Sequence, residues 1–524
     1  MARQVPFVTV HAPRGMVTTV DHLASGAGVA MLRAGGSAAD AAIAANAVLA
    51  VTTQHMCGLG GDLFAVVHDG TGVVALDASG RSGSGADAAR LREAGHVAVP
   101  FRGDVAAVTV PGCVDGWVAL HERYGRLPLG DVLAPAIDYA RDGFPASPLL
   151  AGAVRGLAGV EHTDDYPPGL RAGEIVRRPG VARALADLAA GGRDAWYRGE
   201  FGTRLVGLGR GQFTPDDLAA RHAEWVTPLQ LEVWGHEVWT VPPGSQGYVT
   251  LAAAWIAQGL PLPDDPDDPR WAHLLVEAAK QAGHDRPAVL HEGADGAALL
   301  APERLAPRRD AIDEASATRV GAPAAAGGTI HLNAVDAGGL AVSLTQSNCA
   351  GFGAHVVVPG VRVFLHNRGT GFSLVPGHPA ELGPRRRPPH TLCPTLVTAP
   401  GGAPRWVLGT MGADSQPMVL LQLLARLLHA GQDPATAVAA ARFVLTGPDA
   451  APFGVWTDPS ALRVRVEAGA PEAWTRGLRE RGHEVEEIEP YAYVAGHAHV
   501  VGVGAPALAG AADPRARTGA ASGW

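Results

Sequence analysis

The sequence predicts an α+β fold in which a helix-rich first part precedes a strand-rich part. Alanine-rich segments with helical periodicity occupy residues 25–51, and further helical patterns fill much of residues 114–232. A glycine-rich loop and two strand patterns lie between them, at residues 57–81. After residue 328 the β pattern dominates. With 524 residues, the chain is long enough for several domains or for one large layered unit.

The first stretch is predicted to form two helices separated by a glycine pair. Ser37 and Asp40 give the second helix, AADAAIAANAVLAV, a start that resembles a capping box. Its small alanine side chains permit close packing against a sheet. A further helical pattern runs through residues 114–142, where Pro128 and Pro135 are predicted to mark helix starts.

The middle of the chain has weaker patterns. After the loop CGLGGDLF, a first strand, a turn at residues 69–72 and a second strand are predicted, and the second strand ends at Arg81. Residues 143–232 are mostly helical and polar. Residues 301–328 carry alternating charges followed by Ala, Pro and Gly, without a clear period. We expect this last segment to be an exposed linker.

A β-hairpin is predicted immediately after the linker. The strands TIHLNAVD and LAVSLTQS are joined by the turn at residues 337–339. Because side chains alternate along a strand, the second strand has a small polar face and an apolar face. The first face holds Ala341, Ser343, Thr345 and Ser347, and the second holds Leu340, Val342 and Leu344. An amphipathic helix is expected at residues 417–429.

The composition argues against several classes of partner. The formal net charge of −9 is spread along the chain without a basic stripe, so we expect no nucleic-acid partner. No run of about 20 apolar residues could span a bilayer, and the first residues lack the apolar stretch of a signal peptide. The four cysteines form neither a CxxC pair nor a zinc-type spacing. We therefore expect a reduced, cytoplasmic protein with no membrane partner.

Thr329 follows two glycines directly in GGTIHLNAVD, where the predicted strand begins. A threonine hydroxyl is a weak nucleophile and needs a base. Its own α-amine, with a pKa of about 7.7–8.0, could act as that base once the preceding peptide bond is cut. The flexible glycines would let Oγ attack the carbonyl of Gly328, and an N-to-O acyl shift followed by hydrolysis would free the amine. The motif alone is equally compatible with an ordinary threonine that opens a strand.

Many further motifs accompany this threonine, in a characteristic order. They are LRAGGSAADAAIAANAVLAV, GLGGDLF, VPGCVDGWVALHERYGRLPL, APAIDYARDGFP, VPPGSQGY, GGTIHLNAVD, FGAHVVVPG, RRRPPHTLCPT, GTMGADSQP and, near the end of the chain, DPR. Over nearly its whole length the chain resembles the γ-glutamyltranspeptidase family of N-terminal-nucleophile hydrolases. The number of motifs in matching order makes this resemblance far more specific than any single pattern.

The resemblance implies a particular fold and a maturation step. The fold is a four-layer αββα sandwich of the N-terminal-nucleophile hydrolase type, with extra helices in the N-terminal part. The protein would be a proenzyme that cleaves itself between Gly328 and Thr329. The pieces, residues 1–328 and 329–524, would remain intertwined as one structural unit and form a heterodimer. A dimer of such heterodimers is left open.

The resemblance also assigns roles to individual residues. Thr329 would be the nucleophile and the new N-terminus, and Ser347 would hydrogen-bond to it. The backbone N–H groups of Gly412 and Ala413 would form the oxyanion hole, a role that does not need a glycine side chain. Arg81 would bind a substrate carboxylate through its bidentate guanidinium. The alternatives are a cross-strand hydroxyl for Ser347 and a lone surface arginine for Arg81.

The substrate pocket departs from the family pattern. Gly371 replaces the acidic residue that binds the α-amine of a γ-glutamyl group, and Arg368 follows Asn367. An ammonium group beside Arg368 without a carboxylate partner would be disfavoured. The acyl half of the pocket is therefore predicted to have changed. The other substrate-binding candidates are His390 and Thr391, in place of paired serines, and Asn348, adjacent to Cys349.

These observations predict a self-cleaving threonine amidohydrolase or acylase of this family. It would hydrolyse a small amide through an acyl-enzyme on Thr329, and acyl transfer is left open. With Arg81 and Arg368 both in the pocket, the preferred acyl group would end in a carboxylate without an ammonium group; an Arg368 that points to solvent or pairs with an acid is the alternative. Two other functions remain: a true γ-glutamyltransferase or glutathione hydrolase, and an inactive family member that acts as a binding protein.

No metal and no organic cofactor are implied. His497 and His499 share one face of a late strand, but the sequence shows no third ligand. The GLGGD loop lacks both the Gly-x-Gly-x-x-Gly pattern and a following lysine, so it is a weak signal for nucleotide binding. Asp414 and Gln416 lie beside the expected oxyanion loop and are candidates for pocket residues or helix caps.

Overall fold

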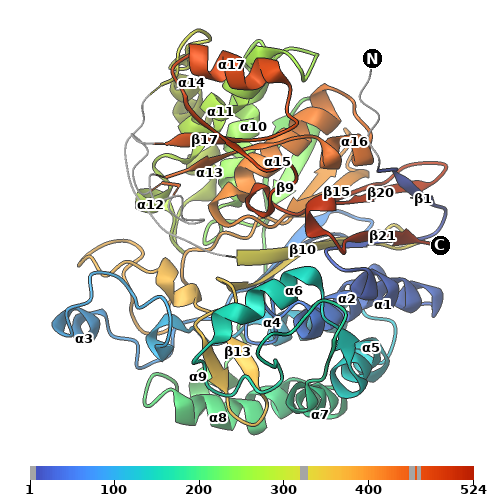
Figure 1. The fold of residues 1–524 in the computed structure, drawn as a ribbon, viewed down its shortest axis with the longest axis vertical. Helices are drawn as coiled ribbons and strands as arrows, with labels where there is room; N and C mark the ends of the chain where they lie inside the picture. Colours follow the sequence, from blue (N-terminus) through green and yellow to red (C-terminus); the bar gives the residue numbers. More distant parts are fainter. Residues whose placement is uncertain (1–6, 319–327, 448–454, 457–461) are drawn as a thin grey trace.

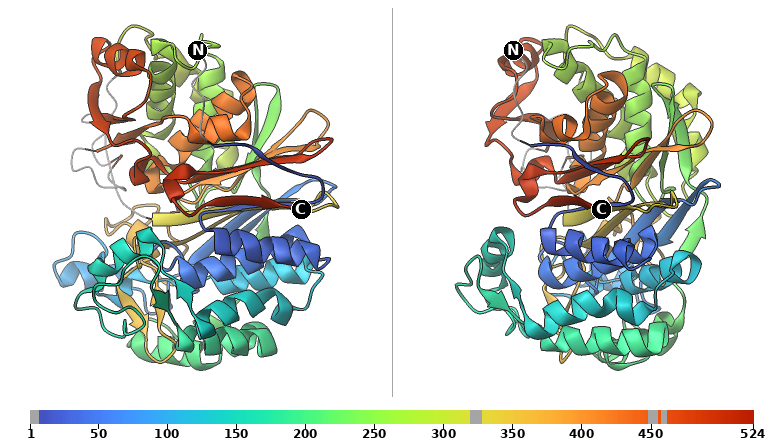
Figure 2. Two further views of the ribbon diagram at one scale, coloured as in Figure 1. Left: turned by 45° about the vertical axis from the view of Figure 1, so that its right-hand side comes forward. Right: turned by 90° about the vertical axis from the view of Figure 1, so that its right-hand side faces the viewer.

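Two seven-stranded sheets stack face to face at the centre of the protein, and helices cover the outer face of each (Figures 1 and 2). The computed structural model describes residues 7–318, 328–447, 455–456 and 462–524. The layers follow the order helix, sheet, sheet, helix. This arrangement confirms the predicted αββα sandwich.

Both sheets are antiparallel throughout, and both contain strands from before and after Thr329. The first sheet has the order β1 (Val10–Ala12), β20 (Leu508–Ala512), β19 (Ala498–Gly502), β15 (Pro404–Thr410), β14 (Thr395–Thr398), β9 (His236–Thr240), β8 (Leu229–Val233). The second has the order β21 (Ala520–Gly523), β2 (Met16–Thr19), β10 (Gly328–Val335), β11 (Ala341–Cys349), β3 (Asp62–His68), β4 (Val73–Ala78), β7 (Glu224–Val226). The segments on either side of Thr329 are therefore interleaved.

Helices from the first half of the chain cover the second sheet in two tiers. The inner tier is α1 (His22–Arg33), α2 (Ala38–Thr52) and α4 (Cys113–Tyr124). The outer tier is α5 (Leu129–Asp142), α7 (Pro179–Tyr197) and α8 (Glu200–Leu208). The outer tier supplies the extra N-terminal helices predicted from the sequence.

The first sheet is covered by α10 (Gly247–Gln258), α15 (Gln416–Leu424) and α16 (Pro434–Ala439), with α11 (Pro269–Gly283) outside them. The remaining helices are α3 (Ala88–Glu93), α6 (Pro148–Ala153), α9 (Pro215–Ala219), α12 (Arg286–Val289), α13 (Gly296–Leu300), α14 (Pro302–Asp310) and α17 (Glu472–Glu480). The remaining strands are β5 (Phe144–Pro145), β6 (Ile175–Val176), β12 (Val356–Val358), β13 (Val363–Leu365), β16 (Phe443–Thr446), β17 (Arg463–Glu467) and β18 (Glu484–Ile488). Short turns of other helix types are η1 (Val105–Ala107), η2 (Val154–Leu157), η3 (Arg368–Gly371), η4 (Ala413–Ser415), η5 (Ala425–His429), η7 (Tyr493–Ala495) and η8 (Pro514–Ala516).

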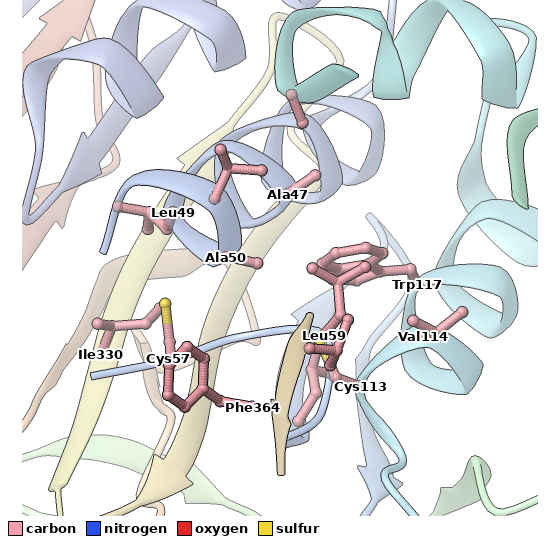
Figure 3. Packing of buried hydrophobic residues seen from close by; sticks show 14 of the residues in the cluster. Ala47, Leu49, Ala50, Cys57, Leu59, Cys113, Val114, Trp117, Ile330 and Phe364 are labelled. Atoms are coloured by element: carbon pink, nitrogen blue, oxygen red, sulfur yellow. The ribbon is translucent and has the colours of Figure 1, made fainter. Parts of the chain in front are cut away.

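Helix α2 is buried along its whole length. Ser37 and Asp40 form the predicted capping box at its start. Its small side chains let it lie between the second sheet and α5, because alanine adds little width to a helix. Leu49 of α2 belongs to the same apolar cluster as Ile330 of β10 and Trp117 of α4 (Figure 3). This packing supports β10, the strand that carries Thr329.

Two sequence-based expectations were wrong. Helix α5 begins after Pro128 as expected but continues through Pro135, which does not start a new helix. The loss of one backbone donor is tolerated there because α5 packs between α2 and α7. The expected linker at residues 301–328 begins with helix α14, whose Leu305 is fully buried. Residues 319–327 lie outside the described part of the chain.

Four buried polar side chains, which we call the polar seam, lie on the face of the second sheet that meets the first sheet: His331, Asn333, Ser343 and Thr345. The Ser343 hydroxyl donates to the carbonyl of Leu408 (3.1 Å) and accepts from the amide of Thr395 (3.0 Å), both in the first sheet. The opposite face of β11 presents Val342 and Leu344 to the helices. The predicted alternation of this strand is thus confirmed.

Across the described residues, none of the helices combines the length and apolar character needed to cross a bilayer.

Gly409 of β15 is expected to be intolerant of any side chain. A Cβ atom there would lie 2.2 Å from the ring of His331, which is held between the sheets. We predict that Gly409→Ala lowers the free energy of unfolding by about 1–3 kcal/mol, because overpacking forces neighbours apart. Urea denaturation measures this change. Gly72→Ala is the matched control, since its Cβ would meet nothing within 4 Å; equal losses in both variants would contradict the close packing of the sheets.

Candidate active site

Thr329 lies at the start of β10, where its side chain is completely buried in the uncut chain. Its Oγ1 donates to Oγ of Ser347 at 3.1 Å. Ser347 lies on the neighbouring strand β11 and also accepts a hydrogen bond from the amide of Cys349 at 2.8 Å. The β10–β11 register shifts between Gly328 and Ile330, next to this contact. The structure therefore brings together the two hydroxyls that the sequence predicted to meet.

Gln416, the first residue of α15, holds Thr329 from the side of the first sheet. Its Nε2 donates to Thr329 Oγ1 at 3.4 Å, while its Oε1 accepts from the amide of Cys393 at 3.1 Å. Of the two roles left open for Gln416, the geometry favours that of a site residue over that of a helix cap.

The loop before α15 has the geometry of an anion-binding turn. Gly412 and Ala413 both have positive φ, at 143° and 55°. Among the described residues, neither of their amide N–H groups donates a hydrogen bond to another group of the protein. The carbonyl of Ala413 accepts from Nε2 of Gln246 at 2.8 Å, which fixes the orientation of the loop. Successive amides in such a turn form a concavity that suits an oxyanion.

Asp62, in the GLGGDLF motif, is the first residue of β3 and anchors His390. Its Oδ1 accepts from the amides of Gly80 (3.0 Å) and Gly112 (3.1 Å), and its Oδ2 lies 3.0 Å from Nε2 of His390 and 3.3 Å from Nδ1 of His366. Burial alone would raise the pKa of Asp62, but these two histidines and the Gly80 amide outweigh burial and lower it to about 2. Asp62 is therefore a buried carboxylate that positions His390.

His390 and Thr391 connect this anchor to the oxyanion loop. Burial lowers the pKa of His390 to about 3, so its ring is neutral at pH 7. Gln246 Nε2 donates to the carbonyl of Thr391 at 3.0 Å as well as to that of Ala413. The hydroxyl of Thr391 accepts from Nη2 of Arg368 at 3.3 Å. The sequence predicted His390, Thr391 and Arg368 as pocket residues, and the structure places all three together.

A cavity of about 430 Å³ opens beside these residues. Arg368, Gly371 and Thr391 line it, and so does Arg286 of α12. Arg286 was not predicted from the sequence. Its Nη1 donates to Oδ1 of Asp414 at 3.0 Å, one residue after Ala413. Burial raises the pKa of Asp414 to about 6, although Arg286 and Arg368 oppose the shift.

Asn348 supports the backbone around the site. Its side-chain Nδ2 donates to the backbone carbonyl of Gln54 at 3.1 Å. The backbone carbonyl of Asn348 accepts from the backbone amide of Asn367 at 3.2 Å. The side chain is fully buried. These contacts tie the end of β11 to the segment that carries Arg368.

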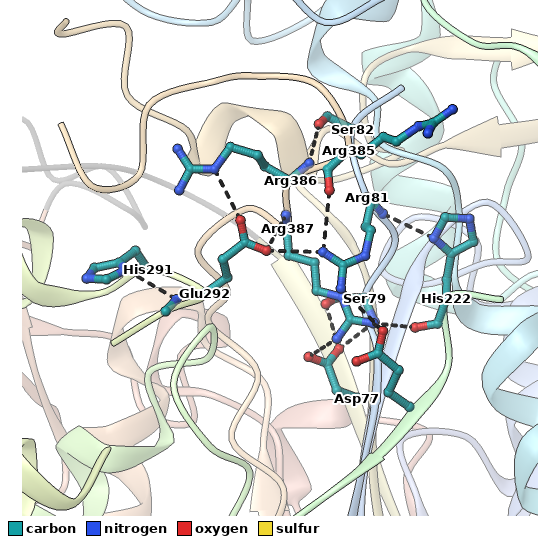
Figure 4. Close-up of polar contacts among 12 residues, drawn as sticks. Asp77, Ser79, Arg81, Ser82, His222, His291, Glu292, Arg385, Arg386 and Arg387 are labelled. Atoms are coloured by element: carbon teal, nitrogen blue, oxygen red, sulfur yellow. Dashed lines mark hydrogen bonds and ion pairs between the residues drawn. The ribbon is translucent and has the colours of Figure 1, made fainter. Parts of the chain in front are cut away.

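Arg81 belongs to a separate charged cluster (Figure 4). Its guanidinium lies 3.2 Å from carboxylate oxygens of both Glu224 and Glu292, and it also donates to the carbonyl of Arg385 at 3.4 Å. Arg81 is not among the residues that line the cavity. The structure thus groups Arg286, rather than Arg81, with Arg368.

Of the histidine pair noted in the sequence, His499 lies on β19 and His497 directly precedes this strand; both rings are buried. Within the part of the chain that the structure describes, the geometry of a three-ligand metal site is met instead by His273, Glu277 and His483. There the two imidazoles are hydrogen-bonded directly at 2.8 Å, and Lys280 donates to Glu277 at 2.7 Å. His273 also contacts the carbonyl of Asp313, and Thr318 donates to Glu277, so these side chains are hydrogen-bonded to one another and to the segment after α14.

Comparisons with known proteins identify the family of this chain. The family model described as Gamma-glutamyltranspeptidase matches residues 24–523. A similar curated protein is the oxamate amidohydrolase proenzyme of Klebsiella pneumoniae, 38% identical over 97% of this chain and 98% of the relative. The glutathione hydrolase-like YwrD proenzyme of Bacillus subtilis is 35% identical over the same shares.

Among solved structures, the cephalosporin acylase from Bacillus halodurans superposes with a TM-score of 0.88 at 32% identity, covering 100% of this chain and 99% of the acylase. The chain belongs to the γ-glutamyltranspeptidase family. Within that family it is a γ-glutamyltransferase-like amide hydrolase. The family and the enzyme class predicted from the sequence are confirmed.

The Asp62 anchor predicts a pH-dependent stability. Because its pKa falls from 3.8 to about 2 on folding, it contributes stability that is present above pH 3.8 and lost as the pH drops through about 2. Asp62→Asn should therefore lower the free energy of unfolding by about 2 kcal/mol at pH 7, and the difference from wild type should shrink below pH 4. Denaturant titrations between pH 2 and pH 7 measure it. Asp138→Asn, at an exposed aspartate, is the control. If the difference in free energy of unfolding between wild type and Asp62→Asn did not change with pH, this would contradict an ionised Asp62.

Proposed function

We propose that the protein is a self-cleaving threonine amidohydrolase or acylase that hydrolyses a small amide through an acyl-enzyme on Thr329. The observation that supports this most directly is the position of the Thr329 hydroxyl. It is hydrogen-bonded to Ser347 on one side and to Gln416 on the other. Gln416 follows the Gly412–Ala413 loop by only a few residues, so nucleophile and oxyanion donors belong to one constellation.

The first reaction of this proposal is maturation. Thr329 Oγ attacks the carbonyl carbon of Gly328, and the C–N bond breaks as its electrons and the hydroxyl proton pass to the threonine nitrogen. Water then hydrolyses the resulting ester, which leaves a carboxylate on Gly328 and a free α-amine on Thr329. Two of the similar proteins, the oxamate amidohydrolase and YwrD, are themselves called proenzymes.

Turnover uses the new amine as the base. With a pKa of about 7.7–8.0, a minor but useful fraction of the amine is unprotonated near neutral pH, and the amine lies within its own residue's reach of Oγ. It takes the hydroxyl proton as Oγ attacks the substrate carbonyl, and the amides of Gly412 and Ala413 stabilise the oxyanion. The leaving amine receives that proton, and water hydrolyses the acyl-enzyme in the same way.

The assembly follows from the interleaved sheets. Residues 1–328 and 329–524 would stay together as a heterodimer, because each sheet needs strands from both. A dimer of heterodimers and a cytoplasmic location stay predictions. In this proposal, neither a metal nor an organic cofactor takes part.

Two alternatives differ from this proposal at identifiable positions. A true γ-glutamyltransferase or glutathione hydrolase needs an acid for the substrate ammonium, and Gly371 stands at the position that supplies it in the family pattern. An inactive binding protein would not need the contact between Thr329 and Ser347. A comparison of γ-glutamyl and glutaryl anilides as substrates distinguishes a γ-glutamyltransferase from the proposed acylase. Any turnover of an anilide excludes the inactive binding protein.

Removal of the nucleophile should block both reactions. Thr329→Ala is expected to leave a single chain of 53.8 kDa without amidase activity, because no hydroxyl remains to attack. Thr329→Ser, which keeps the hydroxyl, should still cleave. Denaturing gels and intact mass spectrometry show the outcome. A wild-type protein that is uncut and yet active would refute this mechanism.

Ser347→Ala tests the hydrogen bond to the nucleophile. We expect self-cleavage and turnover both to slow by about 10- to 100-fold, the effect of a hydrogen bond of about 1.5–3 kcal/mol to a developing charge. Time courses of chain cleavage and of amine release give the two rates. Ser522→Ala, on β21 of the same sheet, is the control. Unchanged rates would reduce Ser347 to a structural residue.

A further inference from the structure

The oxyanion loop, residues 411–413, is held in place through its backbone carbonyls. The carbonyl of Met411 accepts a hydrogen bond from Oγ1 of Thr410 at 2.7 Å. The carbonyl of Gly412 accepts from the backbone amide of Ser415 at 2.8 Å. These two carbonyls lie in the same peptide units as the two proposed oxyanion donors, the amides of Gly412 and Ala413. Both hydrogen bonds therefore act on units that carry a donor.

A hydrogen bond to a carbonyl also fixes the direction of the N–H group in the same peptide unit. A trans peptide unit is planar, and its C=O and N–H bonds point in opposite directions. The unit between Met411 and Gly412 is trans. While the carbonyl of Met411 is bonded to the hydroxyl of Thr410, the N–H of Gly412 must point to the other side of the loop. A side chain on one side thus directs the donor on the other.

This peptide unit needs such a restraint because a glycine follows it. Rotation of a peptide unit changes ψ of the residue before it and φ of the residue after it, and glycine accepts a wide range of φ. The φ of Gly412 is 143°, a value that other residues rarely adopt. Glycine at this position permits the observed orientation but does not enforce it. The hydroxyl of Thr410 supplies the restraint.

The second donor is held by the backbone itself. The hydrogen bond from the amide of Ser415 closes the turn η4 and fixes the unit that contains the amide of Ala413. Gln246 then holds the carbonyl of Ala413 at 2.8 Å, in the following unit, whose N–H belongs to Asp414. Thr410 therefore differs from Gln246, because the hydrogen bond of Thr410 lies in a unit that carries a proposed donor.

The surroundings of Thr410 favour this contact. Thr410 is the last residue of β15 and is buried. Gly496 packs against both partners, since a Cβ atom there would lie 2.6 Å from the carbonyl oxygen of Met411 and 2.8 Å from Oγ1 of Thr410. The amide of Met411 donates to the carbonyl of His497 at 3.1 Å, so both backbone polar groups of Met411 are held. A hydrogen bond shielded from water in this way restrains orientation strongly.

We propose that Thr410 is a positioning residue for turnover, whose hydroxyl keeps the amide of Gly412 directed at the oxyanion that forms on the substrate. Donors that are already oriented stabilise this charge without having to turn during the reaction. The inference rests on the proposed amidase function and adds a residue that keeps one of its oxyanion donors in place. The hydroxyl of Thr410 itself makes and breaks no bond to the substrate.

Three substitutions separate the hydroxyl of Thr410 from the shape of its side chain. Thr410→Val keeps the shape without the hydroxyl, Thr410→Ser keeps the hydroxyl without the methyl group, and Thr410→Ala loses both. In the valine and alanine variants, kcat should fall by about 10- to 100-fold while KM stays within about threefold, because a misdirected donor weakens binding of the transition state rather than of the substrate. In Thr410→Ser, kcat should stay within about threefold of wild type. The constants come from p-nitroaniline release, with whichever of the glutaryl and γ-glutamyl anilides the wild type hydrolyses faster.

Thr446→Val is the matched control. Thr446 is the last residue of β16, is buried, and its hydroxyl also donates to the carbonyl of the next residue, at 3.3 Å. Loss of this hydroxyl should leave kcat within about threefold of wild type. Kinetic constants are measured on protein that has cleaved itself, and the thermal unfolding of each variant separates a loss of stability from a loss of kcat. If Thr410→Val does not mature, the comparison of Thr410→Ala with Thr410→Ser still isolates the hydroxyl.

Three results would overturn the role of Thr410 while the amidase function stands. They are full kcat in Thr410→Val, an equal loss of kcat in Thr410→Ser and Thr410→Ala, and a change confined to KM. The first two would show that the side chain acts through packing or not at all, and the third that it affects substrate binding. A matured wild-type enzyme that hydrolyses neither anilide would instead overturn the proposed function, and this inference with it.

Discussion

The antiparallel pairing of β10 with β11 is the contact on which the site depends. It places Ser347 beside Thr329, and it turns the polar seam of both strands toward the first sheet. Buried polar groups are costly unless they are hydrogen-bonded, so the contacts of Ser343 with Leu408 and Thr395 restrict how the two sheets can stack. A shift of the pairing register of β11 by one residue would turn the apolar face of this strand toward the polar seam. The hairpin therefore sets the sheet stacking and the nucleophile position together.

Much of the fold followed from local sequence patterns. The capping box of α2 and the alternation of β11 depend on residues a few positions apart, and both are present. The errors concern segments whose structure depends on distant neighbours. Helix α14 forms within a segment with no clear period because Leu305 finds a buried place against the other helices. Helix α5 continues through Pro135 for a similar reason, since its neighbours compensate for a lost backbone bond.

The candidate site also contains some contacts that follow from local sequence patterns and others that depend on residues distant in the chain. The contact between Thr329 and Ser347 was predictable, because a hairpin of known turn length brings the two together. Arg286, on α12 far from Thr329 in sequence, carried no pattern of its own. Gln246 stood in the motif VPPGSQGY, but its contacts with Thr391 and Ala413 are tertiary properties. Asp62 stood in a motif that was noticed, but its buried position between two histidines is a tertiary property. Arg81 was predicted as a pocket residue from its place at the end of a strand. Its charged cluster could not be predicted, because its acidic neighbours Glu224 and Glu292 come from elsewhere in the chain.

The interleaving of strands has a consequence for how the cleaved protein would come apart. Each sheet contains strands from both sides of Thr329, so neither fragment retains a complete sheet without the other. Separation of the fragments would thus be the same event as global unfolding, and refolding would become a reaction between two molecules that depends on their concentration. One peptide bond broken at the start of β10 would convert a chain that refolds alone into an assembly whose lifetime is governed by the rate of unfolding.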